Sequence, residues 1–291
     1  MLVVPFDIER RSGCCPVTPT TCQSTAFAGQ YACRGSETVR QALAGQHNDG
    51  ESPAIPLFEQ NRLLALLAEG DLKPLVPEMQ TIAFEPPMVL YEPHAPITHV
   101  YFPLTGIISM IVVGEDGGDV EAATIGNEGV AGLGGLLSGD VSFSRQVVQM
   151  GGTAVRIARG PFLKAANQSR RMRGLLAAHT DAFTAQLMQS ASCNARHDVE
   201  QRLARWLLTL ADRSGRTSLP FIHHAAAAML GVQRPTVTLA ARMMQTAKLI
   251  DYRRGTLEIL DRTGLTEIAC ECYGIIRSTY DAVLEVDAGD D

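Results

Sequence analysis

Apolar positions along the chain follow two different spacings. Between residues 75 and 158 they form short β-rich runs, separated by glycine or proline at intervals of roughly ten residues. Short runs of this kind are typical of a sandwich or roll of strands. We expect strands at Thr98–Pro103, Ile107–Val113, Val120–Ile125, Arg145–Met150 and Ala154–Ile157.

From about Arg170 the apolar spacing becomes helical. Apolar and small polar residues recur at alternating steps of four and three, which is the spacing of a two-helix coiled-coil seam. The seam becomes polar toward Asn194, where a hinge is expected at residues 194–197. The alternative is a helix that packs only on its own sheet. The predicted seam consists of Leu176, Thr180, Phe183, Leu187 and Ser190.

Residues 219–260 have the spacing of a helix, a turn, a second helix and a hairpin. A short Ala-rich helix at residues 225–230 ends at Gly231, because glycine adopts the left-handed conformation that a tight turn requires. The second helix begins at Arg234 or Pro235, since proline is tolerated in a first helical turn. The buried face of this second helix is expected to contain Val237, Ala240, Ala241, Met244 and Ala247.

The other face of this second helix carries hydrogen-bonding and basic side chains at its N-terminal end. Such an end, with its unpaired N–H groups, can enter a DNA major groove and hold phosphates. The hairpin is a wing with arginines at its tip, suited to contact with the DNA backbone. The alternative is two amphipathic helices and a hairpin without a ligand. Candidates for base contact are Gln233, Arg234, Thr236 and Thr238, and those for phosphate contact are Arg242, Lys248, Arg253, Arg254, His223 and His224.

The formal net charge of −6 hides an uneven distribution. Residues 53–158 carry 4 basic and 12 acidic side chains, whereas residues 196–262 carry 11 basic and 6 acidic ones. Charges beyond about 8 Å are screened at physiological salt, so the local excess decides the field at a DNA surface. An acidic half and a basic, DNA-reading half are consistent with this distribution.

Several segments of the chain resemble the Crp/Fnr family of bacterial transcription regulators. ITHVYFPLTGIISM and TIGNEGVAGL resemble the family's cyclic-nucleotide-binding-like β-roll, and VEQRLARWLL resembles its joining helix. LGVQRPTVTLA, LIDYRRGTLEILDR and ACECY resemble its winged half. The resemblance covers roughly residues 57–280. It implies an α+β fold: an N-terminal, jelly-roll-like β-roll sensor domain, a long dimerisation helix and a C-terminal winged helix-turn-helix domain.

The resemblance and the composition divide the chain into five parts. We expect a disordered extension at 1–52, the sensor domain at 53–168, the dimerisation helix and hinge at 169–196, the DNA-binding domain at 197–280 and an acidic tail at 281–291. The family implies a homodimer on a near-palindromic operator in double-stranded DNA, an unknown small-molecule effector and RNA polymerase as a further partner. With no long apolar run and no secretory signal, a cytoplasmic protein without a membrane partner is expected.

Two motifs depart from the family pattern. The family commonly has Arg-Glu-Thr-Val and a second Arg in its reading helix, where this chain has Arg234-Pro235-Thr236-Val237, so the familiar operator should not be assumed. Its nucleotide pocket uses a Gly-Glu pair and a later Arg followed by Ser or Thr. Here Glu128 is displaced by one residue and Arg145 lacks the hydroxyl neighbour that would help to orient a phosphate. We keep both as effector-pocket candidates, favour a structural or ion-paired role for Arg145 and do not favour a cyclic nucleotide as cofactor.

His94 and His99 suggest a rival function. It is a cupin-like, metal-binding β-roll enzyme with a helical appendage. These histidines lack the tight His-x-His spacing and the further ligands of such sites. No paired carboxylates and no Ser/His/Asp or Cys/His set occur in order. We therefore expect neither an enzyme nor a metal site.

The spacing of the cysteines predicts neither a metal site nor a disulfide. Those of the N-terminal extension, Cys14 to Cys33, lack the Cys-x2-Cys run of an iron–sulfur site. Cys193 lies beside the hinge, and we do not favour a redox-sensing role for it. A terminal helix at Leu265–Cys272 would point Cys270 and Cys272 in different directions, so both are expected to pack against the winged domain.

Overall fold

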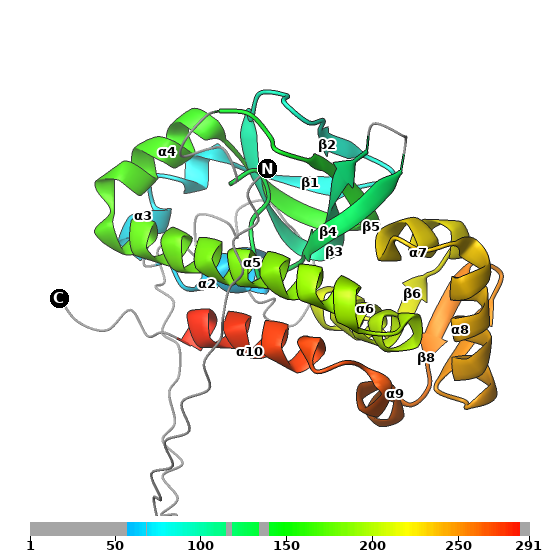
Figure 1. Ribbon diagram of the computed structural model, residues 1–291. Coiled ribbons are helices and arrows are strands. Elements are labelled where there is room, and N and C mark those ends of the chain that lie inside the picture. Colours follow the sequence, from blue (N-terminus) through cyan, green and yellow to red (C-terminus); the bar gives the residue numbers. More distant parts are fainter. Residues whose placement is uncertain (1–56, 68, 115–117, 134–139, 286–291) are drawn as a thin grey trace, which may run out of the picture. The chain divides into compact units, whose positions relative to one another are not determined.

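The computed structural model describes residues 57–67, 69–114, 118–133 and 140–285 (Figure 1). The expected extension at 1–52 and residues 286–291 lie outside the described residues. The helices are η1 (Leu57–Gln60), α2 (Arg62–Ala65), α3 (Glu69–Leu72), η2 (Val76–Glu78), α4 (Arg159–Gln168), α5 (Arg170–Arg196), α6 (Val199–Ser214), α7 (His223–Leu230), α8 (Arg234–Thr246), α9 (Arg262–Ile268) and α10 (Cys272–Glu285). The strands are β1 (Met79–Phe84), β2 (Val89–Tyr91), β3 (His99–Val113), β4 (Asp119–Ile125), β5 (Arg145–Ala158), β6 (Ser218–Pro220), β7 (Ile250–Arg253) and β8 (Thr256–Ile259).

A five-stranded antiparallel sheet dominates residues 57–168, here called the sheet domain. Its strands lie in the order β1-β5-β3-β4, and β2 pairs with β5. Val100 on β3 pairs with Ile157 on β5, and Ile108 pairs with Ile125 on β4. Burial of apolar side chains from the sheet, α2 and α4 provides the main stabilisation of this domain. Its core includes Leu63, Leu64, Phe102, Ile157 and Phe162.

Strands β3 and β5 are longer than the sequence pattern predicts. The two strands expected at 98–103 and 107–113 are one strand, and so are those expected at 145–150 and 154–157. Gly106 and Gly152 lie where the β3–β5 register shifts, and they permit close backbone approach instead of ending a strand. A Cβ at Gly106 would lie 2.6 Å from the Met150 carbonyl oxygen, and one at Gly152 would lie 2.3 Å from that of Thr105.

Helix α5 begins at a Ser169 cap, whose side chain accepts a hydrogen bond from the Met172 N–H. Leu176, the first residue of the predicted seam, is buried in the core of the sheet domain. Of the other seam residues, Thr180 is exposed, and Phe183, Leu187 and Ser190 are half-buried. The predicted seam residues are therefore accessible only from Thr180 onward.

The end of the chain differs from the prediction of a helix at 265–272. Helix α9 ends at Ile268, the chain turns, and α10 begins at Cys272. Cys270 therefore lies in the connection, and the two thiols are not on one helix. Helix α10 packs along α5 through Ile276 and Tyr280, and it continues to Glu285, into the stretch expected to be a tail (Figure 1).

Helices α6 to α9 and strands β6 to β8 form the winged domain, residues 199–268. Helix α6 begins with a capping box, in which Asp198 and Gln201 each bond the other's backbone N–H. Leu203 and Leu207 of α6 are fully buried in the core of this domain, as the apolar stripe predicts. None of the helices in the described ranges is long and apolar enough to cross a membrane.

We expect Gly152→Ala to destabilise the sheet domain severely, because the new methyl group would collide with the Thr105 backbone, which cannot rotate away. The loss should be at least about 1–3 kcal/mol, measured as a lower midpoint of thermal unfolding. Gly160→Ala is the matched control, since no atom lies within 4 Å of its added Cβ on α4. An unchanged midpoint for Gly152→Ala would contradict this packing.

Candidate functional site

Helices α7 and α8 are joined by a turn of the predicted kind. Gly231 has φ +61°, and the N–H groups of Gly231 and Val232 donate to the carbonyl oxygens of Ala228 (3.1 Å) and Ala227 (3.0 Å). These two bonds form a Schellman motif, which ends α7 and aims the chain into α8. Val232 is half-buried and packs against the core of the winged domain between the helices.

Helix α8 buries one face and exposes the other, as predicted. Val237, Ala240, Ala241 and Met244 are buried, whereas Ala247 caps the helix and is exposed. The exposed N-terminal end presents Gln233, Arg234 and Thr236, and the Gln233 side chain makes no capping bond. Thr238 is half-buried and its hydroxyl donates to the Arg234 carbonyl oxygen (3.0 Å), so only its acceptor capacity is available.

The N-terminal end of α8 lies in a concentration of positive charge. His223 is half-buried, and its pKa is lowered by burial and by the charges of Arg234 and Arg242. Its ring packs edge-on against Tyr252 (4.8 Å between ring centroids) and Phe221 (5.1 Å). His223 therefore links α7 to the wing as a neutral aromatic ring, while His224 beside it is exposed.

Strands β7 and β8 form the wing, and β6 completes a three-stranded sheet. The turn contains Arg254 (φ +50°) and Gly255 (φ +85°), two consecutive left-handed residues, as in a tight hairpin turn. Arg254 is exposed at the tip and makes no ion pair with another described residue. Arg253 is also exposed but pairs with Asp251 (Nε–Oδ2 2.9 Å). Arg242 and Lys248 are exposed near the far half of α8.

Residues 201–268 match the family model described as the Crp-like helix-turn-helix domain. We call residues 201–268 the Crp-like domain after this match. The match runs from α6 to the end of α9 and so contains the turn at Gly231, the exposed end of α8 and the wing.

Solved structures of Crp/Fnr regulators share the fold of this chain. FixK2 from Bradyrhizobium japonicum has a TM-score of 0.58 at 18% identity, covering 66% of this chain and 98% of that one. The CRP/FNR-family transcriptional regulator TTHA1359 from Thermus thermophilus has a TM-score of 0.54 at 22% identity, covering 65% and 98%. The c-di-GMP responsive global regulator CLP from Xanthomonas campestris has a TM-score of 0.54 at 16% identity, covering 65% and 98%. No curated protein matches in sequence.

These structures confirm the fold prediction of a sheet domain followed by a helix-turn-helix domain. None of the three structures is described as a cupin-like enzyme, so they give that alternative no support. His94 and His99 belong to no cluster of metal-ligating side chains among the described residues.

The two effector-pocket candidates lie in different environments. Arg145 on β5 pairs with Glu92 (2.9 Å) and Asp119 (3.2 Å), the ion-paired role expected for it. Glu128 is buried and pairs with Arg213 of the Crp-like domain (Oε1–Nε 2.9 Å). Glu128 also lines a cleft with Arg62, Arg277 and residues of α6 and α10, and Arg145 does not. The arrangement does not join the two candidates in one phosphate site.

Arg213 was not predicted as a site residue, although it makes the main polar contact between the sheet domain and the Crp-like domain. Besides Glu128, its guanidinium donates to the Thr124 carbonyl oxygen (2.5 Å) and hydroxyl group and to Gln186 Oε1 on α5 (2.8 Å). The Tyr280 ring of α10 lies 5.5 Å from its central carbon. Nothing in the local sequence marks Arg213, because its partners come from distant segments.

Glu121 and Trp206 form a second polar contact between the halves. The Trp206 Nε1–H donates to Glu121 Oε1 (3.0 Å), and the Ser109 hydroxyl donates to Oε2 (2.6 Å). Burial raises the pKa of Glu121 to about 7, against the opposing effect of these hydrogen bonds. The carboxyl group therefore titrates near neutral pH at the junction of α6 with the sheet.

We expect Arg213→Met to lower the free energy of unfolding by about 3–5 kcal/mol, because Glu128 would be left buried without its partner. Chemical unfolding of the full chain measures this loss. Adding Glu128→Gln should restore part of it, since the remaining group would be neutral. Arg216→Met is the control, because that arginine is exposed. Equal losses for the two arginine variants would contradict a buried ion pair.

We expect the pH dependence of stability to change in Glu121→Gln. The pKa of Glu121 in the folded protein is about 7, above its ordinary value of 4.5, so the folded state binds the proton more tightly. Its stabilising contribution is fully present below pH 4.5 and is lost as pH rises toward 7. Between pH 4.5 and 7 the free energy of unfolding of the variant should therefore rise by on the order of 1–3 kcal/mol relative to that of the parent. Thermal midpoints that differ by the same amount at every pH would contradict this.

Proposed function

We propose that this chain is a homodimeric transcription regulator that reads a near-palindromic operator with the exposed N-terminal end of α8. The Crp-like domain supports DNA binding, and the arrangement of exposed side chains on α8 supports this end as the reading surface. Gln233, Arg234 and Thr236 have the donors and acceptors that base edges recognise in a major groove. Thr238 is a weaker candidate, because its hydroxyl already donates within the helix.

The basic side chains around this end are proposed to hold the phosphates. Arg242, Lys248 and the wing arginines, Arg253 and Arg254, are exposed. Arg254 is the strongest of these candidates, since its turn places it at the wing tip and no described acid neutralises it. Such contacts add affinity for any duplex but carry no sequence information.

The proposed dimer uses the second half of α5. Phe183, Leu187 and Ser190 remain partly accessible at the spacing of a coiled-coil seam, and Met188 next to them is 66% exposed. Two copies paired in this way would present two reading helices to one face of a duplex. RNA polymerase is a further proposed partner of the DNA-bound dimer.

A small-molecule effector is proposed to act where the two halves meet. The cleft beside Glu128 is lined by Arg213 and Arg277, so a ligand there would compete with the buried ion pair or reinforce it. A cyclic nucleotide is not favoured, because Arg145 already pairs with two carboxylates and does not line this cleft.

We expect Arg234→Ala to weaken specific DNA binding by about 1–3 kcal/mol and to leave binding to unrelated duplex nearly intact, whereas Arg254→Ala should weaken both. Fluorescence anisotropy at two salt concentrations, with a duplex from the protein's own promoter region and an unrelated duplex, separates the two effects. Lys164→Ala, which removes one exposed charge from α4, is the control. If all three variants bound the promoter duplex as the parent does, the assignment of the reading surface would be wrong.

A further inference from the structure

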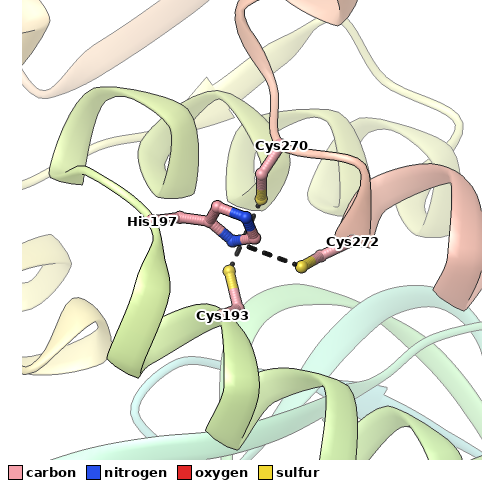
Figure 2. A group of neighbouring side chains, drawn as sticks. All are labelled: Cys193, His197, Cys270 and Cys272. Atoms are coloured by element: carbon pink, nitrogen blue, oxygen red, sulfur yellow. Dashed lines mark hydrogen bonds between the residues drawn. The ribbon is translucent and has the colours of Figure 1, made fainter. Parts of the chain in front are cut away.

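Four side chains that can bind a metal meet where α5 ends (Figure 2). Cys193 and His197 lie one helical turn apart at the end of α5, and Cys270 and Cys272 come from the connection between α9 and α10. Their ligand atoms all lie within 4.8 Å of one another. All three thiols are at most 3% exposed.

The separations between these atoms fit one tetrahedral ion. Cys193 Sγ lies 3.5 Å from Cys270 Sγ, and His197 Nδ1 lies 3.5 Å from Cys272 Sγ. Zinc bonds of about 2.3 Å to sulfur and about 2.0 Å to nitrogen, at tetrahedral angles, place two sulfurs about 3.8 Å apart and a nitrogen and a sulfur about 3.5 Å apart. Because no separation exceeds 4.8 Å, side-chain adjustments of about 1 Å would bring the four groups to this geometry.

We propose that Cys193, His197, Cys270 and Cys272 form a closed Cys3His site for a single Zn²⁺ ion. This set of soft thiolates and one imidazole, with four ligands and tetrahedral spacing, is the donor set of structural zinc sites. An iron–sulfur cube needs a wider arrangement, because each ligand binds a different iron atom. The proposal does not depend on DNA binding, since it rests only on these four side chains and their surroundings.

The neighbours of the four ligands favour a metal over a simple thiol cluster. His197 Nε2 lies 3.1 Å from Glu271 Oε1, so the other ring nitrogen, Nδ1, is free to face the thiols. Figure 2 shows Nδ1 turned toward Cys272. Carboxylates hold metal-binding histidines in this way. Gln189 Nε2 donates to Cys272 Sγ (3.0 Å), a bond that is stronger when the sulfur is a thiolate.

Positive charge around the site compensates for the thiolates. Three thiolates and one Zn²⁺ ion leave a net charge of about −1. Arg205 is close enough to interact with the charge of Cys193. Arg202 is also close enough to interact with the charges of Cys193 and Cys270. The Nε atoms of both arginines are buried without a hydrogen-bond partner among the described residues. Arg202 also donates through a terminal nitrogen to the Leu230 carbonyl oxygen.

A zinc ion at this position would fasten α10 to the end of α5. His197 caps α5 directly before α6 begins, so the same ion would hold the connection between the long helix and the winged domain. The ion would join a Cys-x3-His pair to a Cys-x-Cys pair, and Cys193 and Cys270 are 77 residues apart in the sequence. Metal binding would therefore close a long loop of the chain.

The test is the metal content and metal affinity of the full chain, purified under reducing conditions. We expect about one zinc ion per chain by elemental analysis. After the zinc is removed, titration with Co²⁺ should give the strong visible bands of tetrahedral, thiolate-bound cobalt. Replacing Cys14, Cys15, Cys22 and Cys33 with Ser should leave this signal unchanged, whereas replacing Cys193, Cys270 and Cys272 with Ser should abolish it.

Glu271→Gln is a milder variant that keeps all four ligands. Because it weakens the bond that orients His197, it should lower zinc affinity by about 10–100-fold in competition with a chelator, while saturating Co²⁺ still gives the tetrahedral spectrum. The proposal is overturned if the parent chain binds Zn²⁺ and Co²⁺ no better than the triple Cys193, Cys270, Cys272→Ser variant. Loss of the Co²⁺ spectrum in the N-terminal four-serine variant would also overturn it.

Discussion

A buried guanidinium group needs acceptors on every side, because its charge is costly to remove from water without them. Arg213 meets this requirement with partners from different parts of the chain: Thr124 on β4, Glu128 just after that strand and Gln186 on α5. Separating the Crp-like domain from the sheet domain would leave both Arg213 and Glu128 without partners. Together with the packing of Ile107 and Met150 of the sheet in the core of the winged domain, this ion pair holds the two halves in the arrangement described above.

Helix α5 is the element through which the other contacts are connected. Its first half is buried in the sheet domain through Leu176, its middle meets Arg213 through Gln186, and its end carries Cys193 and His197. A shift of this helix would therefore disturb two groups of contacts with the Crp-like domain and the segment that follows it. These are the ion pair of Arg213 and the cysteine cluster. Glu121 and Trp206 add a third contact, whose strength depends on pH. In the proposed function, a signal from an effector or a dimer partner would reach α8 through these groups.

Local features of the chain were predictable from the sequence, because neighbouring residues determine them. Gly231, the apolar face of α8 and the wing are set by residues within a few positions of one another. The long strands were predicted as shorter pieces, since Gly106 and Gly152 give the same local signal whether they end a strand or bend it. Arg213 and the cysteine cluster were missed for a different reason. Their partners are distant in sequence, and the break between α9 and α10 turns Cys270 and Cys272 toward one centre.

The central claim is that two copies of the α8 N-terminal end read DNA together. Selection of duplexes from a random pool by the full chain, followed by sequencing, tests this claim most directly. We expect enrichment of an inverted repeat whose half-site centres are about 10 base pairs, or one helical turn, apart. Enrichment of no sequence, or of a single half-site without a repeat, would contradict it.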